Sequence, residues 1–166
     1  MPGYADFMAR AYAMELEANE RYTQFADQLE AHNNREVAAM FRKLAEVEML
    51  HARRILKEMN WPSVPALAPA YAGDGAEGPA TAPQDAVHYL MQPRHALEIA
   101  LACEQQAQRY FERIARSKAP KKVLAAAREM AGEEREHVQL IEAWMKRVPK
   151  PAARWDRDPD PPGTGE

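Results

Sequence analysis

The distribution of proline restricts the 166-residue chain to a small number of long helices. Of its 13 prolines, six fall between Pro62 and Pro93 and five between Pro149 and Pro162. Proline lacks a backbone N–H and clashes with the preceding helical turn, so it is rare in helix interiors. The stretches without proline are rich in Ala, Glu, Leu, Met and Arg, which favour helix. We therefore expect helices at about 4–31, 34–59, 93–117 and 120–147.

The connections between these helices indicate how they pair. Residues 32–34 and 117–120 form short turns, and short turns place consecutive helices antiparallel. Residues 60–92 are too many for an ordinary loop, which favours a crossover along the length of a bundle. Within it, only residues 85–91 have the composition of a short helix. The sequence thus predicts an all-α, antiparallel four-helix bundle over 1–148, with a crossover at 60–92 and a Pro/Asp-rich C-terminal tail at 149–166, in which Trp155 contacts the body.

Composition excludes several classes of function. The net charge is −3, with both signs spread along the chain, so no basic surface for nucleic acid is expected. No apolar run approaches the roughly 20 residues of a membrane span, and the N-terminus lacks the pattern of a secretory signal. We expect a cytoplasmic location. Cys103 is the only cysteine, so a disulfide framework or a four-cysteine metal site cannot form within one chain.

Each predicted helix has an apolar stripe at the 3.6-residue period, and each stripe is interrupted by a glutamate. Two of the stripes add a histidine three residues later, on the same helix face. A carboxylate buried on a core face is costly unless it is paired or bound to a metal, so four of them require a common cause. The residues are Glu15, Glu48, His51, Glu104, Glu134 and His137.

The spacing of these residues places them at one height in the bundle. The midpoint between Glu15 and the Glu48/His51 pair falls at His32-Asn33, in the first predicted turn. The corresponding midpoint of the second hairpin falls at Ala119-Pro120. Residues 15–26 and 104–115 also share a pattern of Glu, Ala, aromatic and apolar positions, so the two halves form a pseudo-twofold repeat. Four carboxylates and two imidazoles suit two divalent metals, with iron or manganese favoured.

As a set, these motifs resemble the rubrerythrin and bacterioferritin branch of the ferritin-like superfamily, over about residues 4–147. The resemblance implies a site for two iron ions, with manganese or zinc as alternatives. It implies that Glu48 and Glu134 bridge the two ions and that Glu15 and Glu104 are terminal ligands. It also implies that His51 and His137 bind one ion each. Tyr22 either fills the core or donates a hydrogen bond from its hydroxyl to one of these carboxylates.

The chain departs from the family pattern at two places. Rubrerythrins proper carry a C-terminal rubredoxin domain, and this chain lacks the four cysteines that would build its iron site. Their third helix typically has two ligand glutamates three residues apart. At that spacing from Glu104, this chain has Leu101 and Ala107. Both departures argue against a self-contained rubrerythrin peroxidase cycle. Met49 occupies the position of the bacterioferritin haem ligand, but rubrerythrin-like chains also have methionine there, so haem is not expected.

Two functions remain open from the sequence. The first is an oxidoreductase that oxidises Fe(II) or reduces dioxygen or hydrogen peroxide, with a separate protein as a possible electron donor. The second is non-catalytic iron storage or metal binding. A homodimer or larger homo-oligomer is expected, because Tyr12, Met40 and Met145 are predicted on outer faces near the stripes.

Two further expectations concern single residues around Glu134. Glu133 and Glu136 fall off the apolar stripe, and we expect both to be solvated. Gly132 is unusual in a helix interior, where it costs about 1 kcal/mol relative to alanine. It would allow close packing, or a path for a small oxidant beside Glu134.

Overall fold

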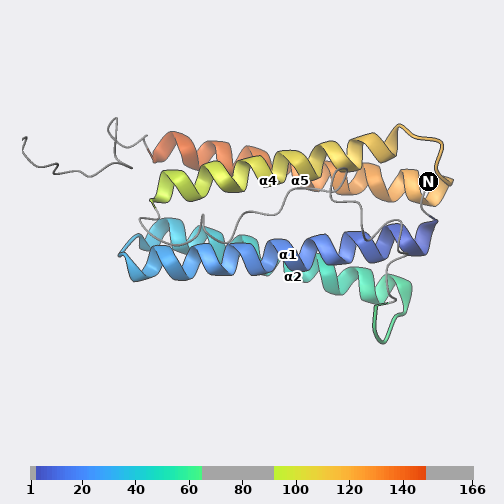
Figure 1. Ribbon diagram of the computed structural model, residues 1–166, viewed down its shortest axis with the longest axis horizontal. Coiled ribbons are helices and arrows are strands. Elements are labelled where there is room, and N and C mark those ends of the chain that lie inside the picture. Colours follow the sequence, from blue (N-terminus) through green and yellow to red (C-terminus); the bar gives the residue numbers. More distant parts are fainter. Residues whose placement is uncertain (1–2, 65–91, 149–166) are drawn as a thin grey trace, which may run out of the picture.

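The computed structural model describes residues 3–64 and 92–148, which form four helices (Figure 1). They are α1 (Tyr4–Ala31), α2 (Arg35–Met59), α4 (Pro93–Ala115) and α5 (Lys121–Arg147). The predicted all-α fold is confirmed, and every helix boundary lies within two residues of its predicted position. Most of the predicted crossover and its short helix at 85–91 lie outside the described residues, as do the tail at 149–166 and Trp155.

The ends of the helices follow from local residue chemistry. Asn33 has a φ of 65° and Asn60 has a φ of 54°, which are left-handed conformations that asparagine tolerates better than most residues. Asn60 ends α2 in this way, and the next N–H, that of Trp61, bonds to the Leu56 carbonyl at 3.0 Å. Pro93 occupies the first turn of α4, where its missing N–H leaves no bond unmade.

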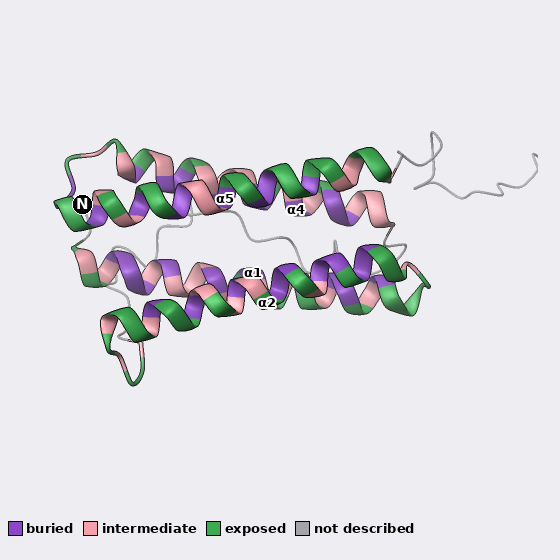
Figure 2. Cartoon of the chain, turned by 180° about the vertical axis from the view of Figure 1, so that it is seen from behind, coloured by how far each residue is buried: buried purple, intermediate pink, exposed green. Residues whose placement is uncertain are grey.

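The helices pair as two hairpins, α1 with α2 and α4 with α5, which lie side by side (Figure 1). Their buried residues form stripes along each helix, as Figure 2 shows, and gather into two apolar clusters. The first cluster includes Phe25, Leu29, Phe41, Leu97 and Ile141. The second cluster includes Phe7, Met8, Phe111, Val123 and Met130. On every helix, the stripe glutamate stands between residues of the two clusters, so a polar layer crosses an otherwise apolar core.

The surface differs from the prediction at Tyr12, Met40 and Met145. Met40 is buried, Tyr12 packs against the second cluster and Met145 packs against the first, so none of them forms an exposed outer face. Their helices turn these positions toward the core more than a single-stripe projection indicated. Among the described residues, the large apolar side chains that are exposed are Leu50 and Leu140. No helix in the described ranges is both long enough and apolar enough to cross a membrane.

Candidate metal centre

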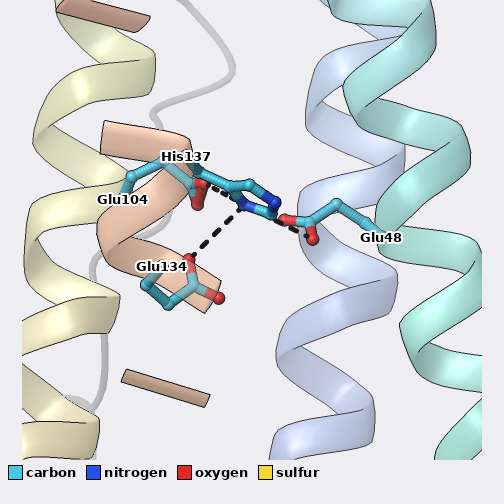
Figure 3. A group of neighbouring side chains, drawn as sticks. All are labelled: Glu48, Glu104, Glu134 and His137. Atoms are coloured by element: carbon cyan, nitrogen blue, oxygen red, sulfur yellow. Dashed lines mark hydrogen bonds and ion pairs between the residues drawn. The ribbon is translucent and has the colours of Figure 1, made fainter. Parts of the chain in front are cut away.

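The structure brings the six predicted residues together in the polar layer. The four glutamates are between 1% and 4% exposed, which is exceptional for a residue that is almost always solvated unless paired. His137 is buried and His51 is partly buried. Figure 3 shows the side chains of Glu48, Glu104, Glu134 and His137 pointing toward one another from α2, α4 and α5. Convergence at one height, predicted from the turn midpoints, is therefore what the fold produces.

The donor atoms form two groups that share one residue. Donors from Glu48, Glu104, Glu134 and His137 lie within 4.8 Å of one another, and so do donors from Glu15, Glu48 and His51. The shared residue is Glu48, whose Oε1 lies 3.6 Å from Nδ1 of His51 and 3.8 Å from Nδ1 of His137. Glu48 thus stands between the two histidines, where a carboxylate could bridge two ions. Glu134 belongs to the His137 group alone.

The remaining distances are those of donors that could share an ion. Nδ1 of His51 lies 3.6 Å from Glu15 Oε2, and Nδ1 of His137 lies 3.0 Å from Glu104 Oε2 and 3.9 Å from Glu134 Oε2. With metal–ligand bonds of about 2.1 Å, two donors on one ion are separated by about 3.0 to 4.2 Å, depending on the angle. All these separations fit that range, whereas most are too long for hydrogen bonds.

Unsatisfied polar atoms give a second test of whether the residues fit a metal pair. Oxygens of Glu15, Glu48 and Glu134 and Nδ1 of His51 are buried without a hydrogen-bond partner in the described ranges. Each such atom costs about 1–3 kcal/mol when left unpaired, and more when charged. A cation coordinated by these atoms removes that penalty. The donor set therefore fits two divalent ions.

The protonation of the site follows from its burial. Burial raises the pKa of Glu48 well above its ordinary value of 4.5, and the nearby charges of Glu15, Glu104 and Glu134 raise it further. Burial, followed by the charge of Glu104, does the same to the pKa of Glu134. Burial lowers the pKa of His137, but the hydrogen bond and charge of Glu104 outweigh it, so the net shift is upward. Each shift favours the protonated form of its group, so without metal the site tends to hold protons.

A cavity of about 20 Å³ adjoins all four carboxylates. It lies between α1 and α4, and its other lining residues include Met14, Arg21, Cys103 and Ala107. A cavity needs about 10–15 Å³ to hold one water molecule, so this space admits one molecule of that size and excludes larger organic compounds.

Tyr22 lies fully buried beside the site. Its ring stacks on Phe41 with centroids 5.5 Å apart, which makes it part of the first apolar cluster. Burial and then the charge of Glu104 raise the pKa of its hydroxyl. That hydroxyl has no hydrogen-bond partner among the residues described, so the predicted hydrogen bond to a carboxylate is not formed here.

Glu133 corrects the prediction that it would be solvated like Glu136. Glu136 is exposed, but the Glu133 side chain is only 19% exposed. Its Oε1 lies 3.8 Å from Nδ1 of His51, and its Oε2 accepts a hydrogen bond of 2.6 Å from Arg54. The stripe pattern missed Glu133 because it considered each helix alone, while the contacts are to residues of α2.

One of the two roles expected for Gly132, close packing, is not what the structure shows. A Cβ atom built at this position would meet no atom within 4 Å, so close packing does not explain the glycine. Its expected role in a path for a small oxidant stays a prediction.

Comparisons with known proteins agree with this geometry. The rubrerythrin family profile matches residues 6–63, which carry Glu15, Glu48 and His51. A solved structure, described as an uncharacterized conserved protein from Magnetospirillum magnetotacticum MS-1, is 34% identical and superposes with a TM-score of 0.76. That match covers 91% of this chain and 99% of the other. No curated protein matches the chain.

Proposed function

Because this chain belongs to the rubrerythrin family of ferritin-like proteins, we propose that its buried Glu/His layer holds two iron ions and oxidises Fe(II) or reduces dioxygen or hydrogen peroxide. The observation that carries the proposal is the position of Glu48 Oε1 between the Nδ1 atoms of His51 and His137. The two histidines belong to separate groups of mutually close donor atoms, so the six residues do not form one compact shell around a single ion. Two donor groups that share the Glu48 carboxylate support a pair of ions.

The proposed ligands divide between the two positions. Glu15 and His51 would hold one ion, Glu104 and His137 would hold the other, and Glu48 would bridge them. Glu134 would complete the His137 position, and the resemblance to rubrerythrins implies that it would also bridge the pair. Mixed imidazole and carboxylate donors suit iron or manganese, with zinc also accommodated.

The protein would contribute binding, exclusion of water and control of protons. An iron pair, when bound, supplies the electrons that a small oxidant takes up. The two apolar clusters flank the polar layer on both sides and keep bulk water away from it. The cavity beside the carboxylates limits the oxidant to the size of dioxygen or peroxide. Glu134, whose pKa is raised by burial, could hold a proton on Oε2, which accepts no hydrogen bond from the described residues.

The test is anaerobic loading of the metal-free protein with Fe(II), followed by rapid mixing with dioxygen or peroxide. We expect about two iron ions per chain and oxidation of both in a single phase that is lost in a Glu48→Ala variant. Fewer than about one ion per chain would contradict the proposal. Storage as the alternative function predicts that repeated additions of Fe(II) and dioxygen raise the count far above two per chain, which requires an assembled shell.

A further inference from the structure

The pseudo-twofold symmetry of the site is broken at the residues that flank the two Glu-x-x-His motifs. In the first half, Val47 precedes Glu48 and Arg54 follows His51 by three residues. In the second half, Glu133 precedes Glu134 and Leu140 follows His137 by three residues. The two sides of the site therefore differ in their flanking residues. The His51 side carries an acid and a base, Glu133 and Arg54. The His137 side carries two apolar residues, Val47 and Leu140.

On the His51 side, carboxylates lead from the surface to the buried layer. The exposed fraction falls from 67% at Glu129 to 19% at Glu133 and then to 4% at Glu15. Arg54 joins the first two, since its guanidinium lies 3.8 Å from Glu129 and 2.6 Å from Glu133. The next contact inward is His51, whose Nδ1 lies 3.8 Å from Glu133 and 3.6 Å from Glu15.

This series of carboxylates ends at buried atoms that themselves require a ligand. Oε2 of Glu15 and Oε1 of Glu48 are buried without a hydrogen-bond partner in the part of the chain that the structure describes. Both face Nδ1 of His51 at 3.6 Å. Glu133 stands outside the group of mutually close donors formed by Glu15, Glu48 and His51, so it is placed to receive an ion rather than to keep it.

Among the described residues, the His137 side offers no comparable route. Val47, Leu140 and Trp144 line a groove of about 830 Å³ that reaches His137. Its acidic lining residues, Glu36 and Glu136, are exposed, and the carboxylates within 4 Å of His137 Nδ1 are the buried ones of the site. A divalent cation that loses hydration water needs anionic partners along its path, because the cost of desolvating an unpaired charge is large.

We propose that divalent cations reach the centre on the His51 side, where Glu133 receives them and Arg54 acts as a latch. The proposal rests on the function proposed above and adds the route of uptake to it. While Arg54 is bound to Glu133, it neutralises the charge of that carboxylate and repels an incoming cation. Glu129 gives Arg54 a second partner, so the guanidinium can leave Glu133 without losing every ion pair. Glu133 then passes the ion inward to His51, Glu15 and Glu48.

The test follows Co(II) uptake by the full-length, chelator-stripped protein, using stopped-flow absorbance of the bound ion. Glu133→Gln keeps the shape of the side chain and should slow uptake about tenfold, by loss of electrostatic attraction. Arg54→Gln should speed uptake by a similar factor, because the latch is gone. Glu136→Gln makes the same change on an exposed position of the same helix and should leave the rate as in the unaltered protein.

Several results would overturn the route. Equal rates in Glu133→Gln and Glu136→Gln would do so, as would slower uptake in Arg54→Gln, which would make Arg54 a support for Glu133 instead of a latch. A loss of bound Co(II) at equilibrium in Glu133→Gln would make Glu133 a resident ligand. Slower uptake only in Glu17→Gln would move the route to the cavity between α1 and α4.

Elemental analysis separates these failures from failure of the proposed function. If the unaltered protein holds about two Co(II) ions per chain and the variants load at equal rates, only the route is wrong. If the unaltered protein holds none, the metal centre itself is wrong, and the route fails with it.

Discussion

The imidazole rings of His51 and His137 lie nearly parallel, with an interplanar angle of 6° and centroids 5.9 Å apart. The two rings come from different hairpins, and each presents Nδ1 to Oε1 of Glu48. Their parallel arrangement reflects the repeat of the two halves, since the same Glu-x-x-His turn is placed at the same height on α2 and α5. A symmetric pair of donors of this kind has little use in a plain apolar core, where neutral residues would pack at lower cost.

Gly132→Ala should stabilise the protein by about 1 kcal/mol, because alanine favours helix and the new methyl group meets no atom within 4 Å. Chemical denaturation of the two proteins measures this difference. Metal content should not change. A loss of stability would restore close packing as the reason for the glycine, and slower reaction with dioxygen alone would support the oxidant path beside Glu134.

Tyr22→Phe should leave the metal-free protein as stable as before, or more stable by up to about 1 kcal/mol, since it removes a buried hydroxyl that lacks a described partner. The ring contacts with Phe41 are kept. Denaturant titration measures the stability and calorimetric titration measures the metal affinity. If affinity falls tenfold or more, the hydroxyl does bond to a carboxylate in the loaded protein, as outer hydrogen bonds to ligands commonly do.

The sequence predicted the helices, their pairing and the six converging residues because these depend on short-range patterns. Proline, helix period and turn position are all local properties of the chain. Glu133 was missed because its partner Arg54 is 79 residues away and reaches it across two helices. Comparison of Glu133 with Val47 in the two halves is the signal that could have found it. Cavity size and unpaired oxygens depend on side-chain packing, which no pattern of residue types specifies.

Stability of the metal-free protein should fall as the pH rises above the ordinary glutamate value of 4.5, because burial raises the pKa values of Glu48 and Glu134. The folded state keeps protons on these carboxyls that the unfolded chain has already lost. Their contribution is therefore complete below the ordinary pKa of 4.5 and disappears as the pH passes the folded value. Urea denaturation at several pH values should show this slope in the unaltered protein and a flatter one in Glu48→Gln. An identical slope in both proteins would exclude Glu48 as its source.

Sedimentation velocity at micromolar concentrations should show a homodimer or a larger assembly. Leu50 is 61% exposed on α2, although leucine is usually buried, and an interface between copies would cover it. Leu50→Glu should then shift the protein toward the monomer without changing its helix content. A monomer in the unaltered protein would contradict the expectation.

Glu134→Gln and Glu136→Gln make the same chemical change two residues apart on α5 and separate ligands from bystanders. Glu134 is 4% exposed, and burial penalises its charge, so the neutral amide should leave the metal-free protein equally stable or more stable. With metal present, the same change removes a proposed ligand and should lower metal affinity by at least about 100-fold, since even outer hydrogen-bond partners of ligands account for 10–100-fold. Stabilisation by bound metal falls with that affinity.

Glu136 is exposed, and its variant should change neither property. Thermal denaturation with and without metal should therefore give effects of opposite sign for Glu134→Gln alone. Matching behaviour of the two variants in the presence of metal would place the centre elsewhere.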